Sequence, residues 1–375
     1  MQKTNVLFLS GGSQVAQFVL TTLQGRRGPL RLLATSSVWD DAGLWEYDKV
    51  FLVPVTRQDP GSFKQRVLEI VSAENIDLIV PCRDDDVGPL AELAAASPDV
   101  ARKALCGTPS LARAFADKWS SWELSAAHGL PFAESVLPGY GESVVEFAAR
   151  VGYPLVAKPR DGFSSKGIFL IENQEQLQRA ANTSNYVIQE YLGNPDEYWS
   201  FRRSIEQEGF PLIHKLGGLM HSIQLMFGPD STLVSVFAAY IDVRFRARDV
   251  RPNPEPATMA LGRKCGEVFS RLGWRGPLNV QCQGDRHGRI KIHEFNGRFT
   301  GVTAERWFLG YDEVALALDR FTGRALEPSQ WASRPAAQAV ARLASRGADP
   351  ANVAALQKHG QWSRSDDEDQ PLHAR

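Results

Sequence analysis

The run His293-Glu294-Phe295-Asn296-Gly297-Arg298 holds the residue types best suited to chemistry in this chain. It follows a strand-like segment at 289–292, and residues two apart on a β-strand point to the same face. Glu294 and Asn296 can therefore offer a carboxylate and an amide oxygen to one ion, and such hard ligands suit Mg²⁺ on nucleotide phosphates. Arg298 continues the stripe as a fixed cation for phosphate oxygens. A charged, exposed strand could have the same composition, so the stripe must be judged together with upstream segments.

A strand, a polar loop bounded by glycines and a second strand occupy residues 156–168. Such a loop can fold over phosphates, with its backbone N–H groups and hydroxyls donating to their oxygens. Lys158, at the end of the first strand, offers a point charge for a phosphate. An ordinary hairpin turn explains the loop equally well when it is taken alone. The loop residues that could reach a phosphate are Gly162, Ser164, Ser165, Lys166 and Gly167.

The apolar strand 187–191 turns polar just before Gly193. An edge of this kind can give backbone hydrogen bonds to adenine while Tyr191 or Leu192 packs on the ring. Glu197 follows, where its carboxylate could accept from ribose hydroxyls. The sequence therefore predicts a nucleotide-binding edge downstream of the glycine-bounded loop.

Taken in order, these segments resemble the ATP-grasp superfamily. The resemblance spans roughly residues 1–325 and includes an N-terminal α/β domain. It is closest to the single-unit, carbamoyl-phosphate-synthetase-like carboxylate–amine ligases. Lys118 belongs to it, although a lysine within the predicted helix 110–128 would by itself be a solvated side chain. The matching segments are Asp117-Lys118, Lys158-Pro159, Ser165-Lys166-Gly167-Ile168, Gln189-Glu190, Glu197, Gln281 and Glu294-x-Asn296-x-Arg298.

The resemblance implies roles for these residues around an ATP molecule. Lys118 and Lys158 would contact its phosphates, and the loop 162–167 would close over the β- and γ-phosphates. Arg298 would stabilise the γ-phosphoryl group and an acyl-phosphate, acting with Lys158 as the catalytic pair. The edge that would hold adenine comprises Gln189, Glu190, Tyr191 and Leu192, with Glu197 on the ribose.

The resemblance also implies a metal site formed by Gln281, Glu294 and Asn296. These residues would hold one or two Mg²⁺ ions that bridge the phosphates, with Mn²⁺ as an alternative. Many relatives have glutamate where this chain has Gln281. The site is therefore less negative here, and the number of ions stays open.

The function implied by the resemblance is an ATP-dependent carboxylate–amine ligase. It would form an amide or peptide bond between small molecules through an acyl-phosphate, releasing ADP and phosphate. A carboxylating enzyme like biotin carboxylase is disfavoured, because the chain lacks an Ala-Met-Lys-Met attachment site and the extra length of such enzymes. A non-catalytic ATP-binding regulatory module is the other alternative. The retained Glu294, Asn296 and Arg298 argue against it, because a sensor could discard metal ligands.

Two arginine-containing segments are candidates for binding the substrates. Arg83 and Asp84 follow the predicted strand 77–80, and ligands bind at the carboxyl ends of such strands. A solvated turn is the alternative explanation for them. Arg244 and Arg246 lie two apart in a predicted strand and would share a face. The solvated face of an edge strand explains these two equally well.

The elements that must position these residues fall into an α/β part and an α+β part. The first hundred residues alternate strands with amphipathic helices, which predicts a doubly wound parallel sheet. Gly11-Gly12-Ser13 lacks the G-x-G-x-x-G spacing and predicts a tight turn rather than a dinucleotide site. Strands are expected through 198–250.

Four segments follow from this organisation, the later ones as the resemblance implies. Residues 1–105 would form a Rossmann-like pre-ATP-grasp domain. Residues 106–190 would form a linker helix and the small subdomain of a two-subdomain ATP-grasp fold. Residues 191–325 would form its C-terminal subdomain with the magnesium site. Residues 326–375 would add a short helical extension and a polar, disordered tail.

Composition and charge are those of an ordinary globular protein, with 43% hydrophobic and 23% charged residues. Because 42 basic residues balance 43 acidic ones, nothing predicts a nucleic-acid partner. Four scattered cysteines without a C-x-x-C pair indicate reduced thiols. No apolar stretch predicts a signal peptide or a membrane span. We therefore expect a cytoplasmic enzyme acting on a small-molecule carboxylate and an amine, and the resemblance suggests a homodimer.

Overall fold

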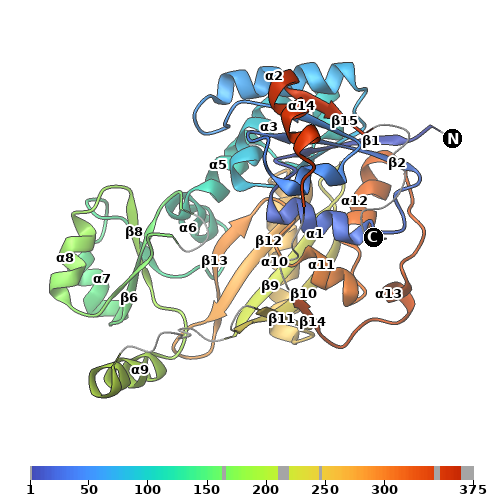
Figure 1. The fold of residues 1–375 in the computed structure, drawn as a ribbon. Coiled ribbons are helices and arrows are strands. Elements are labelled where there is room, and N and C mark those ends of the chain that lie inside the picture. Colours follow the sequence, from blue (N-terminus) through green and yellow to red (C-terminus); the bar gives the residue numbers. More distant parts are fainter. Residues whose placement is uncertain (1, 163–165, 210–218, 245–246, 342–346, 365–375) are drawn as a thin grey trace. The chain divides into compact units, whose positions relative to one another are not determined.

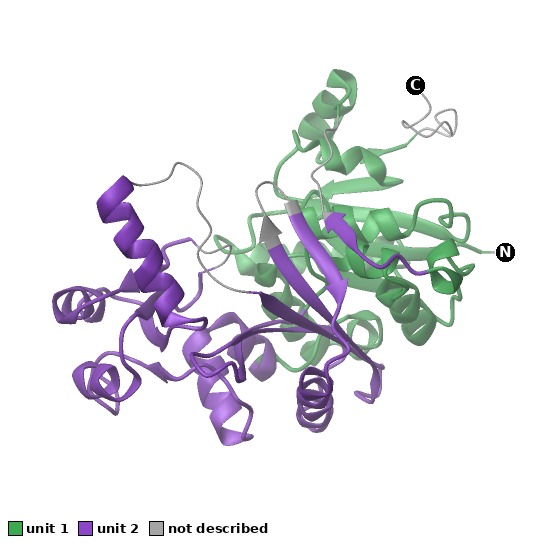
Figure 2. Ribbon diagram, turned by 90° about the horizontal axis from the view of Figure 1, so that it is seen from below, with its two compact units in different colours: residues 1–109, 298–334, 343–375 green, residues 110–297, 335–342 purple. Residues whose placement is uncertain are grey.

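The structure is a computed structural model that describes residues 2–162, 166–209, 219–244, 247–341 and 347–364 (Figure 1). The chain divides into two compact units (Figure 2). Unit 1 combines Met1–Pro109 with Arg298–Arg334 and Leu343–Arg375, whereas unit 2 combines Ser110–Gly297 with Pro335–Arg342. Each unit therefore contains segments that are distant in sequence. The division into four segments expected from the sequence stays a prediction.

Unit 1 is built on a five-stranded sheet with the order β15-β3-β2-β1-β4. β1 to β4 are parallel, and β15 joins the edge antiparallel to β3. The chain runs outward from β1 to β3 and then returns past β1 to β4. With right-handed crossovers, helices α1 and α2 therefore lie on opposite faces. This confirms the predicted doubly wound sheet, whose elements are β1 (Thr4–Leu9), α1 (Gln14–Thr22), β2 (Leu30–Ser36), β3 (Lys49–Leu52), α2 (Pro60–Ala73), β4 (Leu78–Pro81), α3 (Asp84–Ala96) and β15 (Gln361–Ser363).

The turn between β1 and α1 is packed tightly against its neighbours. A Cβ atom on Gly11 would lie 2.5 Å from the Cβ of Ala34, and one on Gly12 would lie 2.3 Å from a carboxylate oxygen of Asp41. The Tyr47 hydroxyl donates to the Gly11 carbonyl at 3.0 Å. Protein side chains thus fill the space beside both glycines, as expected for a structural turn.

The remaining elements of unit 1 are short. The short helices predicted after residue 321 are α13 and α14, and α14 leads into β15, which the sequence did not predict. The tail predicted to be disordered from residue 363 was wrong at its start, since Ser363 ends β15 and Arg364 N donates to the Asp48 carbonyl at 2.9 Å, and its remainder, 365–375, lies outside the described residues. The remaining elements of unit 1 are η1 (Ala42–Glu46), α4 (Pro98–Lys103), α11 (Thr303–Phe308), α12 (Glu313–Thr322), α13 (Gln330–Ser333) and α14 (Pro350–His359).

Unit 2 contains a four-stranded antiparallel sheet with the order β5-β8-β6-β7. Helices α7 and α8 cover one face of this sheet, where Phe147 and Leu177 pack against Leu155 and Ile188. On the other face, Val156 packs against Tyr198 of helix α9. The elements are β5 (Ser135–Val136), α7 (Val144–Val151), β6 (Leu155–Pro159), β7 (Phe169–Ile171), α8 (Gln174–Ala181), β8 (Tyr186–Glu190) and α9 (Pro195–Glu208).

The second sheet of unit 2 has six strands in the order β13-β12-β9-β10-β11-β14. Helix α10 packs against β9 and β10. Buried residues such as Leu225 and Phe269 belong to these elements and are inaccessible to solvent. The elements are β9 (Met220–Phe227), β10 (Leu233–Arg244), β11 (Ala247–Pro252), α10 (Pro256–Arg271), β12 (Gly276–Gly284), β13 (Ile290–Asn296) and β14 (Ala339–Ala341).

Two predicted elements were wrong. The single helix expected over 110–128 is broken at Asp117 into α5 (Pro109–Ala116) and α6 (Lys118–Ala127). Among the residues that the structure describes, the strands expected from residue 198 begin with β9, because α9 occupies Pro195–Glu208. Asn194 caps α9 and Pro195 stands in its first turn, which are both helix-start signals. No helix among the described residues is long and apolar enough to cross a membrane.

Candidate functional site

The break at Asp117 brings Lys118 to the glycine-bounded loop. The Asp117 carboxylate caps α6 by accepting from Ser120 N at 2.9 Å and forms an ion pair with Arg160 at 2.6 Å. The backbone N–H of Lys118 donates to the Arg160 carbonyl at 2.9 Å. The Lys118 ammonium then donates to the carbonyl of Gly162 at 2.5 Å. The sequence context alone suggested that Lys118 is a solvated helix lysine, but its ammonium contacts the start of the loop instead.

Lys158 on β6 shares an electrostatic environment with Lys118 and with Glu294 on β13. Burial and the nearby Lys118 lower the pKa of Lys158 to about 8, although Glu294 acts in the opposite direction. His293, beside Glu294, is held neutral, because burial, Lys158 and Lys118 lower its pKa to about 3. Two lysines and one carboxylate thus converge in unit 2 from α6, β6 and β13.

The predicted metal ligands lie side by side on neighbouring strands. Gln281 on β12 pairs in register with Glu294 on β13, and Asn279 pairs with Asn296. Residues paired in this way share a face, so their oxygen atoms can approach one ion. The sequence interpretation did not include Asn279, whose buried side-chain amide donates to the Ser222 hydroxyl at 2.8 Å and to the Gln224 side-chain carbonyl at 3.0 Å.

The donor set fits a hard cation such as Mg²⁺, because it consists of one carboxylate and amide oxygens. Within the described part of the chain, no group of three or more His, Cys, Asp or Glu side chains could hold a metal. One protein carboxylate therefore leaves most of the charge of a bound cation to be balanced by another anion, such as phosphate.

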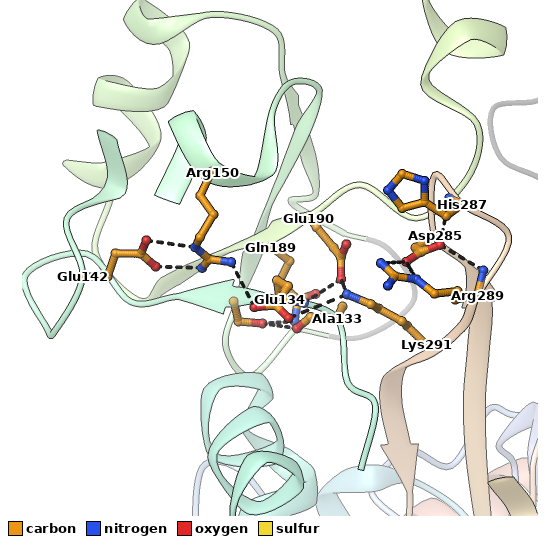
Figure 3. A network of polar contacts seen from close by, with 11 residues as sticks. Ala133, Glu134, Glu142, Arg150, Gln189, Glu190, Asp285, His287, Arg289 and Lys291 are labelled. Carbon is orange, nitrogen blue, oxygen red and sulfur yellow. Dashed lines mark hydrogen bonds and ion pairs between the residues drawn. The ribbon is translucent and has the colours of Figure 1, made fainter. Parts of the chain in front are cut away.

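The polar end of β8 lies where the two sheets of unit 2 meet (Figure 3). Gln189 is fully buried, and its side-chain N–H donates to the Ser135 hydroxyl at 2.9 Å. The Glu190 carboxylate forms an ion pair with Lys291 on β13 at 2.5 Å. The backbone N–H of Glu190 donates to the Glu134 carbonyl at 2.9 Å. The side chain of Glu190 is thus engaged by the protein itself.

The residues after β8 form a small aromatic cluster. Tyr191 and Leu192 are buried, and the ring of Tyr191 lies 5.8 Å from that of Tyr198. Burial raises the pKa of Tyr191, and Glu197 in the first turn of α9 adds to this effect. Glu197 therefore lies close to the predicted adenine edge, on a helix.

The predicted residues of unit 1 interact with one another. The Arg298 guanidinium forms an ion pair with Asp84 at 2.6 Å and also donates to the Phe299 carbonyl at 2.9 Å. Asp85 pairs with Arg57 at 2.6 Å. Asp86 is buried and accepts from the Ser10 hydroxyl at 3.0 Å. The acidic run is therefore engaged within unit 1 and does not form a simple solvated turn, whereas Arg83 is exposed.

Several predicted site residues cannot be placed. Ser164, Ser165 and Arg246 lie outside the described residues. Arg244 ends β10, and its side chain is not described. Lys166 and Gly167 precede β7, and the Tyr186 hydroxyl donates to the Gly167 carbonyl at 2.9 Å.

No family model matches the sequence, and no curated protein is significantly similar to it. Solved structures do match. N5-carboxyaminoimidazole synthetase from Staphylococcus aureus, complexed with ADP, has a TM-score of 0.63 and 13% identity, over 87% of this chain and 79% of its own. A biotin carboxylase-β-γ-ATP complex from Campylobacter jejuni has a TM-score of 0.63 and 14% identity, over 87% and 72%. L-amino acid ligase from Bacillus licheniformis has a TM-score of 0.60 and 13% identity, over 86% and 75%.

This chain has the ATP-grasp fold. At 13–14% identity the likeness establishes the ATP-grasp architecture alone. It confirms the predicted fold class, with a doubly wound parallel sheet in unit 1 and the two ATP-grasp sheets in unit 2.

Proposed function

We propose that this protein is an ATP-dependent ligase that joins a small-molecule carboxylate to an amine and releases ADP and phosphate. The observation that supports the proposal best is the convergence of Lys118, Lys158 and Glu294 beside the start of the glycine-bounded loop. Two cations and one metal-binding carboxylate match the charge pattern of a magnesium–polyphosphate complex. Small-molecule substrates, a cytoplasmic location and a homodimer belong to the same proposal.

The names of similar structures agree with this choice of chemistry. The N5-carboxyaminoimidazole synthetase structure contains ADP, and the L-amino acid ligase is named for joining amino acids. Biotin carboxylase is another such neighbour, and carboxylation is therefore the second candidate reaction. The two reactions differ in the substrates that stimulate ADP release.

In the proposed site, Lys118 and Lys158 bind the phosphates, and Gln281, Glu294 and Asn296 hold Mg²⁺. The metal, when bound, would neutralise charge on the phosphate oxygens. The loop 162–167, including Ser164 and Ser165, covers the phosphates in this proposal. The adenine edge comprises Gln189, Glu190, Tyr191 and Leu192, with Glu197 on the ribose. Arg298 acts on the transferred phosphoryl group, and Arg83, Asp84, Arg244 and Arg246 are substrate-binding candidates.

The proposed reaction has two steps that balance. A substrate carboxylate oxygen attacks the γ-phosphorus, and the bond from that phosphorus to the oxygen of ADP breaks. The amine nitrogen then attacks the acyl carbon, a C–N bond forms, phosphate leaves, and the nitrogen loses a proton. The first step is needed because a carboxylate lacks a usable leaving group. The protein contributes positioning and charge neutralisation, chiefly through Lys118 and Lys158.

The test is ADP release from MgATP in the presence of pooled amino acids and small carboxylates, with hydroxylamine added. A ligase of this type gives substrate-dependent ADP and a hydroxamate, because hydroxylamine traps the acyl-phosphate. Bicarbonate-dependent ADP release with a biotin acceptor would favour carboxylation. Tight ATP binding without turnover would favour a regulatory module instead.

Substitution of Glu294 separates a catalytic site from a binding module. We expect Glu294→Gln to lower the rate of ADP release on the order of 100-fold or more while the protein stays folded, because only charge at the site is removed. Glu267→Gln on the exposed face of α10 is the matched control and should leave the rate unchanged. Equal rates for Glu294→Gln and the wild type would contradict the assignment.

A further inference from the structure

We infer that the ion pair between Glu190 and Lys291 positions the nucleotide site by fixing β8 against β13. The inference rests on the proposed function, because that proposal makes the end of β8 the adenine edge. Glu190 would then act through Lys291 rather than by touching the nucleotide with its side chain. Lys291 becomes a positioning residue that the sequence interpretation did not include.

Residues 131–136 form an extended bridge between the two sheets of unit 2. Toward β13, Ala133 N donates to the carbonyl of Ile292 at 2.7 Å. Toward β8, the carbonyl of the next residue, Glu134, accepts from Glu190 N at 2.9 Å. A single extended segment of this kind can bend, so side-chain contacts across it help to set the angle between the sheets.

The Glu190 side chain closes the same junction (Figure 3). One carboxylate oxygen accepts from Glu134 N at 2.8 Å and from the Lys291 ammonium at 2.5 Å. A second carboxylate, that of Glu134, lies 3.7 Å from Lys291 and 3.4 Å from Arg150. Three segments, β8, the bridge and β13, therefore meet at one carboxylate.

Burial makes this pair more constraining than a surface ion pair. The side chains of Glu190 and Lys291 are only 8% and 13% exposed, so little water competes for either charge. Removing one partner of such a pair leaves the other charge buried and unpaired. By contrast, Arg289 in the turn of the same hairpin is 68% exposed and pairs with Asp285, four residues earlier, within the hairpin itself.

The pair joins β13, which carries Glu294, to β8, the strand that pairs with the one carrying Lys158. On β13, Lys291 precedes Glu294 by three residues. On the other side, Glu190 pairs in register with Leu155 at the start of β6, the strand that carries Lys158. The ion pair therefore helps to fix the separation between Lys158 and Glu294, which interact electrostatically.

The experiment compares Lys291→Met, Glu190→Gln and the double variant with the wild type. The dissociation constant of MgADP is measured by calorimetry, kcat and KM for ATP by ADP release, and Tm by thermal unfolding. Arg289→Gln is the matched control, because it removes an ion pair of the same hairpin whose arginine is 68% exposed, while the buried Asp285 carboxylate keeps its hydrogen bonds from the backbone N–H groups of His287 and Arg289.

We expect Lys291→Met to weaken MgADP binding by about 10- to 100-fold, because small displacements of positioned groups are costly. Glu190→Gln should lose less, since Gln can still accept from Glu134 N and Lys291 keeps Glu134 nearby. The double variant should regain part of the affinity lost in Lys291→Met, because no buried carboxylate is left unpaired. Arg289→Gln should bind as the wild type does.

Wild-type affinity for MgADP in folded Lys291→Met would overturn the inference, and so would a lowered Tm with an unchanged dissociation constant. The proposed function fails separately. A wild-type protein that binds MgADP without ever releasing ADP from ATP would overturn the ligase, while the binding data would still decide the role of the pair. A wild-type protein that binds no nucleotide would overturn both.

Discussion

At the scale of single residues, the proposed site contains one lysine, Lys158, whose pKa is shifted by its surroundings. Burial is the main cause that lowers the pKa of Lys158 on β6 to about 8, and repulsion from the nearby Lys118 adds to it. Glu294 opposes both effects without cancelling them. The charge of Lys158 is therefore sensitive to a bound anion, because polyphosphate would favour the protonated form.

This sensitivity predicts a pH-dependent affinity for MgADP. As the pH rises from about 7 to about 9 through the lowered pKa of Lys158, binding should weaken and should take up a proton. Lys158→Arg should flatten this dependence, since arginine stays charged. Calorimetry in two buffers of different ionisation enthalpy would measure the proton uptake. An affinity that does not change across this range would contradict the assignment of Lys158 to the phosphates.

The lowered pKa of Lys158 has the opposite effect on the folding stability of the nucleotide-free protein, which rises with pH whereas the affinity for MgADP falls. Because the folded protein favours neutral Lys158, this residue's favourable contribution to stability is present above its unfolded pKa of about 10.4. The contribution is lost as the pH falls through about 8.

At the scale of elements, a helix break and a strand end position the phosphate-binding candidates. Residues 110–128 do not form one helix, because the helix breaks at Asp117. The Asp117 carboxylate caps α6 and also pairs with Arg160 at the end of β6. The start of α6 is thus attached to the strand that carries Lys158, and Lys118 reaches the Gly162 carbonyl. The helix start and the loop start are held together by these contacts.

Substitution of Asp117 should therefore affect both stability and nucleotide binding. Asp117→Ala should lower the free energy of unfolding by about 1–2 kcal/mol, since the N-cap and the ion pair are lost together. Asp117→Asn keeps a capping oxygen and should lose less stability. Both should weaken MgADP binding, because Lys118 is no longer fixed. Chemical denaturation and calorimetry would measure these effects, and an affinity unchanged in Asp117→Ala would refute the link.

At the scale of the whole molecule, the chain returns to its first sheet after leaving it. Residues 298–334 and the C-terminal part rejoin unit 1, and β15 pairs with the edge strand β3. The ring of Trp362 on β15 packs edge-on against Trp45 at 5.2 Å, and its N–H donates to Asn352 at 3.2 Å. The C-terminal strand is therefore part of the core of unit 1.

Because β15 packs on unit 1, we predict that removing the Trp362 ring lowers the free energy of unfolding more than removing the Trp39 ring does. Trp362 is 9% exposed, and Trp362→Ala should lower the free energy of unfolding by about 3 kcal/mol or more. Trp39, which is 40% exposed in the same unit, is the control, and Trp39→Ala should stay within about 0.5 kcal/mol. Urea denaturation monitors both variants. Equal losses would show that β15 adds little to unit 1.

The alternation of residue types was enough to predict many of the local elements and the strand that carries Glu294 and Asn296. The alternation of side chains between the two faces of a strand over 289–296 placed Glu294 and Asn296 on one face. The structure pairs them with Gln281 and Asn279 across β12 and β13. The βαβ order of the first hundred residues predicted the parallel sheet of unit 1. Helix α9 was missed, although Asn194 and Pro195 are local signals that could have predicted its start.

Contacts between distant residues were decided only by the tertiary structure. Asp117 meets Arg160 across 43 positions, Glu190 meets Lys291 across 101, and Asp84 meets Arg298 across 214. Periodicity reports which face of an element a side chain occupies, but not which element that face meets. The sequence by itself therefore determined the parallel strands of unit 1, the strands that carry Lys158 and Glu294, and the residue types of the candidate site in their order. Only the folded chain determined that the helix predicted over 110–128 is broken before α6, that Lys118 reaches the loop and that Glu190 is held by Lys291, because ion pairs and hydrogen bonds across such separations form only after the elements have packed.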